Sequence, residues 1–516
     1  MIRTRTSPGN RLLTRAARLR VLYVLVLFAA ASRGDDVPNL TEADVRTVIQ
    51  KAAESIDAST MVIAVTNRQG DILGIFHKPD APALAQGNFG MQVDANELAV
   101  GLARTGGFFS NNQAPLSSRT VRYISGIHFP PGISFTGNAD LYGIENTNRG
   151  CFIADAADFA DGKRIPPARS IDGTQSGLGI MTGKANLNDS DPSAVNPGGV
   201  PLFKQGVLVG GLGVAGVPPN VAEFAAYTGG WMAGFLPSPP PNDKLPEPQV
   251  VIIGGIALPF VNQQDRPAGF GPGTFSGGFV FLPKDSPGPA PDGDLIEPRD
   301  GPLGGLSQNE VRRIIDAGIA QANLTRAVIR LPSGSRAKFV FAVADLDGTI
   351  IGLNRMPDAT IFSIDVAVAK SRNVIYFSGA DRKQTELDGV PVNTAVTNRT
   401  ISFGAQPFYP PGIDYSTPGP FFDLYRFDTL NPCTQGQQAA NGKQNGIVFF
   451  PGSLPLYKNG KLVGGLGVSG DGVDQDDFAT AAAAVGFEPP APIRADRVID
   501  RGVRLPYLKF PRNPTN

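Results

Sequence analysis

The sequence contains one long pattern of segments twice, and this duplication constrains the chain more than any other feature. Residues 40–45 (Leu-Thr-Glu-Ala-Asp-Val) return as residues 306–311 (Leu-Ser-Gln-Asn-Glu-Val). Residues 200–214, which end in a glycine-rich Leu-Val-Gly-Gly-Leu-Gly-Val, return as residues 454–468 with the same ending. Because the matching segments keep their order, we predict a duplicated domain. We therefore look for a function first in the single repeat and then in the pair of repeats.

The first 34 residues have the composition of a secretory signal rather than of a folded segment. Six arginines precede an apolar run of eleven residues, 21–31, and small residues follow it. Such a run is too short to cross a bilayer, which takes about 20 residues. We therefore expect a cleaved export signal and a periplasmic or extracellular protein, with an uncleaved N-terminal anchor as the alternative.

The charge of the remaining chain argues against a nucleic-acid partner. Residues 1–34 hold seven of the 46 basic residues and no acid, so 39 basic residues face 46 acidic ones, a net charge of −7. Nucleic-acid binding depends on neutralising phosphates, for which this balance is unsuited. The 62 glycines and 46 prolines indicate many turns and long loops rather than a helical bundle.

Two cysteines, Cys151 and Cys433, lie one in each repeat, downstream of a Pro-Pro-Gly. Export permits a disulfide between them. Such a bridge contributes up to about 5 kcal/mol in the chain-entropy model. Two free, buried thiols are the alternative. Two Cys and two His are too few for a cysteine-based metal site.

Each repeat is predicted to contain the same five elements. They are a capped first helix (starting at Thr41 or Ser307), a hairpin (61–76 or 339–353), a second helix (96–109 or 364–377), a closing hairpin (turning at Gly206 or Gly460) and a last helix (near Val221 or Asp474). Both first helices carry an acidic residue three positions after the cap, as a capping box requires. Since hairpins dominate and the βαβ pattern is missing, the sequence favours an α+β fold.

These elements define the domain organisation that we expect. The first domain spans residues 35–235 and the second 306–490, with a C-terminal tail at 491–516. Residues 236–305 are rich in Pro and Gly and are predicted to be a connector with a small β element, in which 250–258 pairs with 279–282.

Common catalytic and cofactor motifs are not supported. Asp345 and Asp347 lie in a hairpin turn, and an EF-hand needs many more ligands at set spacing, so we interpret them as turn formers. The glycine-rich strands end hairpins, whereas a dinucleotide loop joins a strand to a helix in a βαβ unit. No Gly-x-Ser-x-Gly elbow precedes a helix.

The second repeat resembles the GlcG/HbpS family, also called haem-degrading or DUF336-type domains. The resemblance depends on residues 341–348, 355–359 and 367–372 and is most specific at the closing hairpin, 454–471. Residues 40–230 carry it more weakly. It implies two tandem copies of an α+β domain, each with an antiparallel sheet of about five strands covered by helices. The copies are expected to face each other as an intramolecular pseudo-dimer.

The first repeat departs from the pattern of the second at two polar positions. Leu102 stands where the second repeat has Lys370, and His77 stands where it has Arg355. Repeat one also carries about 26 extra residues before Pro201.

The resemblance implies haem as a possible cofactor, and this selects candidate ligand residues. They are His128, His77, Tyr123, Tyr409, Arg119 and Arg399. His128 is the candidate iron ligand, because haem iron takes His, Met, Cys or Tyr. The arginines suit a propionate, although an ion pair inside each unit explains them equally. The aromatics also suit core packing, and the two histidines suit a packed loop edge (His128) and an exposed loop (His77).

We therefore expect an exported tandem protein that binds haem or a similar flat carboxylated ligand. One alternative is a cofactor-dependent oxidoreductase that degrades such a ligand, and another is a non-catalytic interaction module at the cell envelope. The expected partner is a small molecule, and no nucleic-acid partner is expected. After cleavage the chain should have no stable membrane span. A homo-oligomer is possible.

Overall fold

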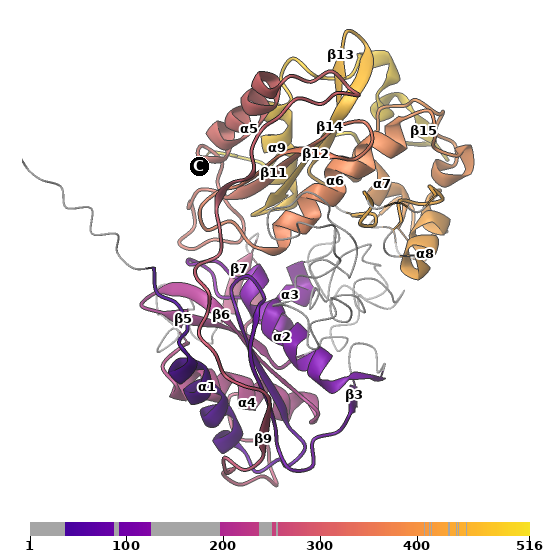
Figure 1. The fold of residues 1–516 in the computed structure, drawn as a ribbon. Helices are drawn as coiled ribbons and strands as arrows, with labels where there is room; N and C mark the ends of the chain where they lie inside the picture. The colour runs from indigo at the N-terminus through magenta and orange to yellow at the C-terminus, as the bar shows by residue number, and fades with distance from the viewer. Residues whose placement is uncertain are drawn as a thin grey trace, which may run out of the picture. The chain divides into compact units, whose positions relative to one another are not determined.

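The structure is a computed structural model that describes residues 37–515, except 87–91, 125–196, 237–249, 254–255 and a few positions between 407 and 450 (Figure 1). All of its helices and strands lie in the compact unit Pro38–Asn516. The predicted signal segment, His128, Cys151 and Cys433 lie outside the described residues, as does the side chain of Tyr123. No helix in the described part is long and apolar enough to cross a membrane.

Repeat one is a five-stranded antiparallel sheet between helices. The strand order is β5 (Gly199–Lys204), β6 (Val207–Ala215), β1 (Val62–Asn67), β2 (Ile72–His77) and β9 (Gly278–Phe281). Helices α1 (Glu42–Ser55) and α4 (Pro219–Met232) pack together, and α2 (Ala95–Phe109) packs on β6. The remaining elements are β3 (Leu84–Gln86), β4 (Gln92–Asp94) and α3 (Ser118–Ile124).

Repeat two has the same strand order, counterparts of the four described helices of repeat one, and one further helix, α8. Its strand order is β13 (Ser453–Lys458), β14 (Lys461–Gly470), β11 (Phe339–Ala344), β12 (Ile350–Arg355) and β10 (Gly293–Ile296). Its helices are α5 (Gln308–Ala322), α6 (Phe362–Ser378), α7 (Asn398–Gly404), α8 (Phe422–Leu430) and α9 (Val473–Ala483), with a 3₁₀ turn η4 (Gln384–Leu387). The predicted α+β class with two tandem sheets is confirmed.

The glycine-rich closing strands have a steric cause. A Cβ at Gly211 of β6 would lie 1.9 Å from the carbonyl oxygen of Ala103 in α2. At Gly465 of β14 it would lie 2.1 Å from the carbonyl oxygen of Ser371 in α6. Only glycine permits the helix to lie so close to the strand, so the repeated Gly-Gly-x-Gly is a packing motif here.

The connector supplies the fifth strand of both sheets. β9 pairs with β2, and β10 pairs with β12, each antiparallel. The predicted pairing of 250–258 with 279–282 is wrong, because β7 (Val250–Ile253) forms its own hairpin with β8 (Ile256–Pro259). Each fifth strand leads to an aspartate that accepts the first amide of its repeat's opening helix: Asp285 from Glu42 and Asp300 from Gln308, both at 2.7 Å.

The C-terminal tail repeats the β7–β8 hairpin. β15 (Ile499–Asp500) pairs with β16 (Val503–Arg504), and Leu-Pro-Tyr follows at 505–507, where Leu-Pro-Phe follows at 258–260. Ser117 donates a hydrogen bond to the carbonyl of Phe260, and Thr397 donates one of 2.6 Å to that of Tyr507. The segment around β7–β8 therefore covers the start of α3, and the segment around β15–β16 covers the start of the equivalent helix α7. Each of these tail segments belongs to its own repeat.

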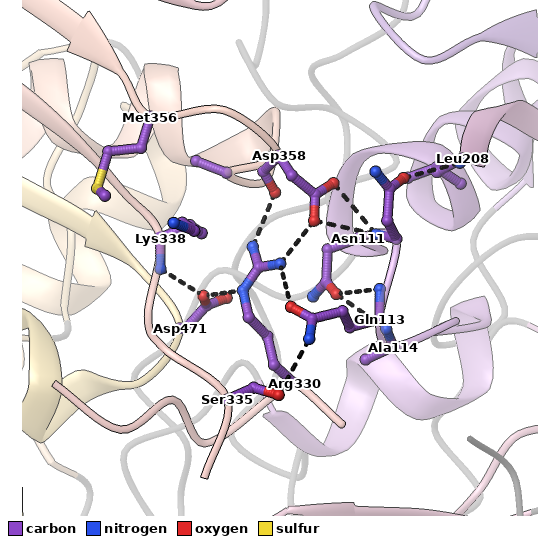
Figure 2. A network of polar contacts seen from close by, with 12 residues as sticks. Asn111, Gln113, Ala114, Leu208, Arg330, Ser335, Lys338, Met356, Asp358 and Asp471 are labelled. Atoms are coloured by element: carbon purple, nitrogen blue, oxygen red, sulfur yellow. Dashed lines mark hydrogen bonds and ion pairs between the residues drawn. The ribbon is translucent and has the colours of Figure 1, made fainter. Parts of the chain in front are cut away.

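The repeats form an intramolecular pair through unlike surfaces. Repeat one contributes an acceptor surface, defined as Arg68, Gln69 and residues 108–113. Repeat two contributes a donor loop, residues 358–362 between β12 and α6, together with Arg330 before β11 (Figure 2). The predicted intramolecular pair is thus formed by a heterologous contact.

Asp358 is the centre of this contact (Figure 2). Its carboxylate accepts hydrogen bonds from Arg68 (2.7 Å), from Arg330 (2.6 Å) and from the backbone amide of Asn112 (3.1 Å). Arg330 also pairs with the buried Asp471. Burial opposes ionisation of Asp358, but the two arginines outweigh it and hold its pKa below the ordinary value. The contact is thus built around a desolvated carboxylate with cations from both repeats.

Backbone and ring contacts extend the same surface. The amide of Ile361 donates to the carbonyl oxygen of Phe108 at 3.1 Å. The rings of Phe109 and Phe362 stack with centroids 4.1 Å apart and planes at 17°. The acceptor surface therefore holds one carboxylate and one flat ring from the donor loop.

Candidate functional site

A cavity of about 580 Å³ lies in repeat two, at the end of α6. It is bounded by the β11–β12 turn, by residues 379–393 after α6, by residues 435–443 and by the closing hairpin. Its polar lining residues are Asp347, Arg372, Tyr376, Ser378, Asp381, Asn393, Gln435, Gln438, Asn441, Lys443 and Tyr457; its apolar ones include Leu346, Ile375, Leu462 and Ile493.

Helix α6 places Arg372 in the wall of this cavity. Its Nε donates to the carbonyl oxygen of Gly348 at 2.9 Å, and its Nη1 donates to Oδ1 of Asn445 at 3.2 Å. Arg104 of α2 makes the first of these contacts in repeat one, to the carbonyl of Gly70 at 3.0 Å. The arginine is thus a shared part of the module, and in repeat two it is fixed beside an open space.

Lys443 is the second cation of the cavity and comes from a segment without a described counterpart in repeat one. Its ammonium pairs with Asp347 and donates to Thr349 Oγ1 at 2.5 Å. Burial opposes ionisation of Asp347, but hydrogen bonds from Lys443 and Thr349 outweigh it and lower its pKa. The predicted turn role of Asp347 is confirmed, since its Oδ1 accepts the Thr349 amide at 3.0 Å.

Two tyrosines line the cavity as neutral phenols. Tyr376 donates its hydroxyl proton to Glu386 at 2.7 Å, and burial together with this carboxylate raises the Tyr376 pKa far above its ordinary value. Burial raises the pKa of Tyr457 to about 12. Both rings therefore offer flat surfaces and hydroxyl groups, and neither is a tyrosinate at neutral pH.

Carboxamides form the remaining wall. Gln435 donates to Gln438 at 3.1 Å and accepts from Asn373 of α6 at 2.8 Å. The amides are therefore oriented by one another and by α6, which favours a ligand with polar edges.

The predicted ligand residues take other positions. Arg119 pairs with Glu223 of α4 at 2.6 Å, and Arg399 pairs with Asp474 and Asp477 of α9 at 2.6 and 2.5 Å. These are ion pairs inside each repeat. Their roles toward a ligand stay predictions.

The other described candidates are also engaged within the fold. His77 ends β2 and lies 2.6 Å from Oδ1 of Asn96. The buried Tyr409 donates weakly to the carbonyl of Asp500 at 3.5 Å, and burial raises its pKa to about 12. Among the predicted residues that the structure describes, none lines the cavity. No group of three or more His, Cys, Asp or Glu in the described ranges is arranged to hold a metal ion.

A buried ion pair lies on another side of α6. Lys370 donates to Oδ2 of Asp476 at 2.9 Å and to the carbonyl of Val468 at 2.7 Å, and both side chains are almost fully buried. Burial raises the pKa of Asp476 to about 7, with Lys370 opposing the rise. In repeat one the equivalent positions are Leu102 and Ala222.

Comparison with known proteins places the second repeat in a family. A family model described as "Haem degrading protein HbpS-like" matches residues 306–485. Residues 306–485 form an HbpS-like domain. The resemblance seen in the sequence is confirmed for this repeat, and the cavity and the Lys370 pair both belong to the HbpS-like domain.

Two solved structures are similar over about a third of the chain. One, a complex of PduOC with haem, is 21% identical and covers 35% of this chain and 94% of its own, with a TM-score of 0.23. The other, protein ORFY of Klebsiella pneumoniae from the DUF336 family, is 19% identical and covers 34% and 86%, with a TM-score of 0.23. No curated protein matches the chain.

Proposed function

We propose that the HbpS-like domain binds haem or a similar flat, carboxylated small molecule in the cavity at the end of α6. The observation that carries this proposal is the equivalence of the cavity to the acceptor surface of repeat one. Turn residues 68–70 correspond to 346–348, and Phe108 corresponds to Tyr376. That surface holds the Asp358 carboxylate of the donor loop; the Phe362 ring stacks on Phe109, whose counterpart Phe377 lies outside the cavity lining.

The cations of the cavity suit a carboxylate. Leu346 replaces Arg68 at the turn, and Lys443 adds a cation beside Arg372, the counterpart of Arg104. Asp347, which pairs with Lys443, and Asp381 line the same cavity. The rings of Tyr376 and Tyr457 provide flat apolar surface, and the carboxamides provide hydrogen bonds. A planar ligand with carboxylates at its rim matches this combination.

The described lining fits the rim of haem and not its iron. Haem iron takes His, Met, Cys or a tyrosinate. The described lining residues include none of the first three, and the raised pKa values keep both tyrosines protonated. The family description supports haem as the first ligand to test, and we derive no chemistry at an iron atom.

A titration with two porphyrins tests the proposal. The purified chain is titrated with hemin and with metal-free protoporphyrin IX, followed by absorbance and calorimetry. We expect micromolar affinity for both. Lys443→Ala should weaken both about tenfold, in line with the loss of one charge-assisted hydrogen bond of about 1.5 kcal/mol.

Lys458→Ala is the matched control. Lys458 forms a half-exposed ion pair with Glu310 on the same domain, away from the cavity lining. It should leave affinity unchanged. Absence of binding by either porphyrin at tens of micromolar, or equal effects of the two lysine substitutions, contradicts the proposal.

We further propose that the chain is exported. The arginine-rich head and short apolar run of residues 1–34 support this. The intact mass of the protein recovered from its native cells should correspond to removal of about 30–35 residues, the length typical of such signals. A full-length mass in the cytoplasmic fraction contradicts it.

A further inference from the structure

In the described part of the chain, the two five-stranded sheets have four edge strands, and the chain itself covers two of them. The amide of Phe203 in β5 donates to the carbonyl of Phe235, and the amide of Tyr457 in β13 donates to the carbonyl of Phe487. Both strands are buried along all but their last residue. The other two edges are β9 and β10, which the connector supplies, and no other described strand pairs with their outer sides.

The edge strand β10 of repeat two carries charges. Asp294 and Glu297 pair with Arg312 of α5 at 2.6 and 3.1 Å. Asn354 of β12 donates to Asp294 at 2.8 Å. An uncovered edge is a template for pairing with another chain, and charged side chains on the edge oppose that pairing. The edge of repeat two is therefore protected by its charges.

The edge strand β9 of repeat one has apolar residues at the same positions. The two edge strands align residue by residue, because both pair in the same register with the equivalent strands β2 and β12. In this alignment Phe279 takes the place of Asp294, and Leu282 takes the place of Glu297. The edge of repeat one therefore carries neither acidic residue.

The arginine beside this edge has a different partner in repeat one. Arg46 of α1 corresponds to Arg312 of α5. Its guanidinium carbon lies 5.1 Å from the centre of the Phe279 ring. Phe76 of β2, the counterpart of Asn354, packs edge-on against the same ring with centroids 5.1 Å apart. A polar cluster in repeat two is thus an aromatic cluster in repeat one.

Apolar side chains extend from this cluster to the surface. Phe275, Val280 and Leu282 are 37%, 56% and 73% exposed. Leu295, the counterpart of Val280 in β10, packs against the core instead. Among the four edges, β9 is thus the one whose described residues leave it uncovered, uncharged and lined by exposed apolar side chains.

We propose that β9 pairs antiparallel with β9 of a second copy of this chain, so that the first repeats of two chains join across a two-fold axis. The strand is complementary to itself. With Val280 opposite Val280, Phe279 lies opposite Phe281 and Gly278 lies opposite Leu282, so the contact is apolar along its whole length.

The charges that flank β9 are compatible with this register. Lys284 lies opposite Ser276, and Asp285 lies opposite Phe275, so no like charges face each other across the axis. Both β9 and β10 contain a bulge at their third residue, which twists an edge strand and keeps the pairing short. We therefore expect a weak dimer, and a two-fold contact closes with two chains. This contact lies in repeat one, goes beyond ligand binding and does not involve the cavity.

Sedimentation velocity of the purified full chain, from about 1 to about 200 µM, tests the pairing over the affinity range of a small interface. The mean mass should rise with concentration toward that of a dimer and no further. Leu282→Glu introduces the repeat-two residue at an exposed position and should weaken association at least about tenfold, because both chains lose an apolar contact and gain a charge. Leu324→Glu makes the same change just after α5, at a residue that is 59% exposed, and should associate like the parent chain.

A cysteine at the centre of the pairing locates the contact. Residues directly opposite in an antiparallel pair have Cβ atoms about 4.5–5.5 Å apart, a distance that a short bifunctional thiol reagent spans. Val280→Cys should therefore cross-link two chains through residue 280, as identified by peptide mass spectrometry. Leu324→Cys should not exceed the parent chain, in which Cys151 and Cys433 set the background.

Four results overturn the inference. They are a parent chain that stays monomeric, association beyond a dimer, equal association of the two glutamate variants, and a dimer that does not cross-link through residue 280. Porphyrin binding is a separate measurement: Leu282→Glu should bind hemin as the parent chain does. A failure of the ligand proposal therefore leaves the pairing intact, and a failure of the pairing leaves the ligand proposal intact.

Discussion

The two repeats differ in the side chains that they bury between the second helix and the last helix. Repeat two buries the ion pair Lys370–Asp476, and repeat one buries Leu102 and Ala222. The surrounding glycines are equivalent: a Cβ at Gly452 would meet Asp476, and one at Gly198 would meet Ala222. The module therefore folds without the pair, in keeping with the modest net value of buried ion pairs.

A neighbouring ion pair is kept in both repeats. Arg119–Glu223 in repeat one corresponds to Arg399–Asp477 in repeat two. The carboxylate also accepts a backbone amide from the tail segment: from Asn262 at 3.2 Å or from Lys509 at 3.0 Å. This arginine pair joins the third helix, the last helix and the tail, so it belongs to the architecture, whereas the lysine pair is particular to the HbpS-like domain.

Removal of the tail should give the largest effect, because the comparison makes it an integral part of repeat two. Deletion of residues 498–516 removes Leu505 and Tyr507, which are 0% and 6% exposed, and uncovers the surface that they bury. Burial of two such side chains contributes about 3–6 kcal/mol. We expect repeat two to unfold at a much lower denaturant concentration, measured by circular dichroism and limited proteolysis. Deletion of residues 515–516 alone should cost about 1 kcal/mol; equal stability of both truncations would show that the tail is only an appendage.

The sequence predicted the first, second and last helix of each repeat, its two central hairpins and the sheet class, because these depend on local patterns and on a duplication that is easy to see. It missed the shorter helices α3, α7 and α8. It also missed the additional hairpin of each repeat, β7–β8 and β15–β16. The strands β15 and β16 have two residues each, too few for a periodic signal. The matched Leu-Pro-Phe and Leu-Pro-Tyr were the available cue.

The edge strands and the cavity were harder to predict. The fifth strands pair with partners far away in the sequence, and only a short local repeat indicates their equivalence, Pro283 and Asp285 against Pro298 and Asp300. Lys443 comes from a segment without a described counterpart, so no repeat argument selects it. Arg372 and Arg104 match in the sequence, and that match was the missed signal for the cavity wall.

Substitution of Lys370 alone should give the next largest effect. Lys370→Leu introduces the repeat-one residue but leaves Asp476 buried without its cation, at a cost of about 3–5 kcal/mol in the free energy of unfolding. Chemical denaturation followed by far-ultraviolet circular dichroism measures it. Lys370→Leu combined with Asp476→Ala reproduces repeat one completely and should recover most of the loss. If the double variant is as unstable as the single variant, the ion pair itself stabilises the domain, and the loss does not come from an unpaired buried charge.

The pair should also give a pH dependence that repeat one lacks. Burial raises the pKa of Asp476 from 3.8 to about 7, although Lys370 opposes the rise. Between about pH 4 and pH 7 the folded chain then holds a proton that the unfolded chain has released, so folding stability falls as pH rises through this window. The stability of the parent chain minus that of the double variant should decrease from pH 4 to pH 7. A difference that stays constant or increases contradicts the assignment.

The smallest effect is expected at the rim of the cavity, where the repeats differ in the first hairpin turn. Asp347 stands where repeat one has Gln69, and its side chain and that of Lys443 are 36% and 37% exposed. Exposed ion pairs contribute at most about 1 kcal/mol, so Asp347→Gln should hardly change the midpoint of unfolding.

Asp345→Asn also introduces a repeat-one residue, but the Asp345 carboxylate is buried and accepts hydrogen bonds from the backbone amides of Leu303 and Gly304 at 2.9 and 2.7 Å. Loss of these charge-assisted bonds should cost about 1.5–3 kcal/mol. If Asp347→Gln proves the more damaging of the two, the Lys443 contact is part of the core of the domain, and the cavity is not a surface that a ligand enters freely.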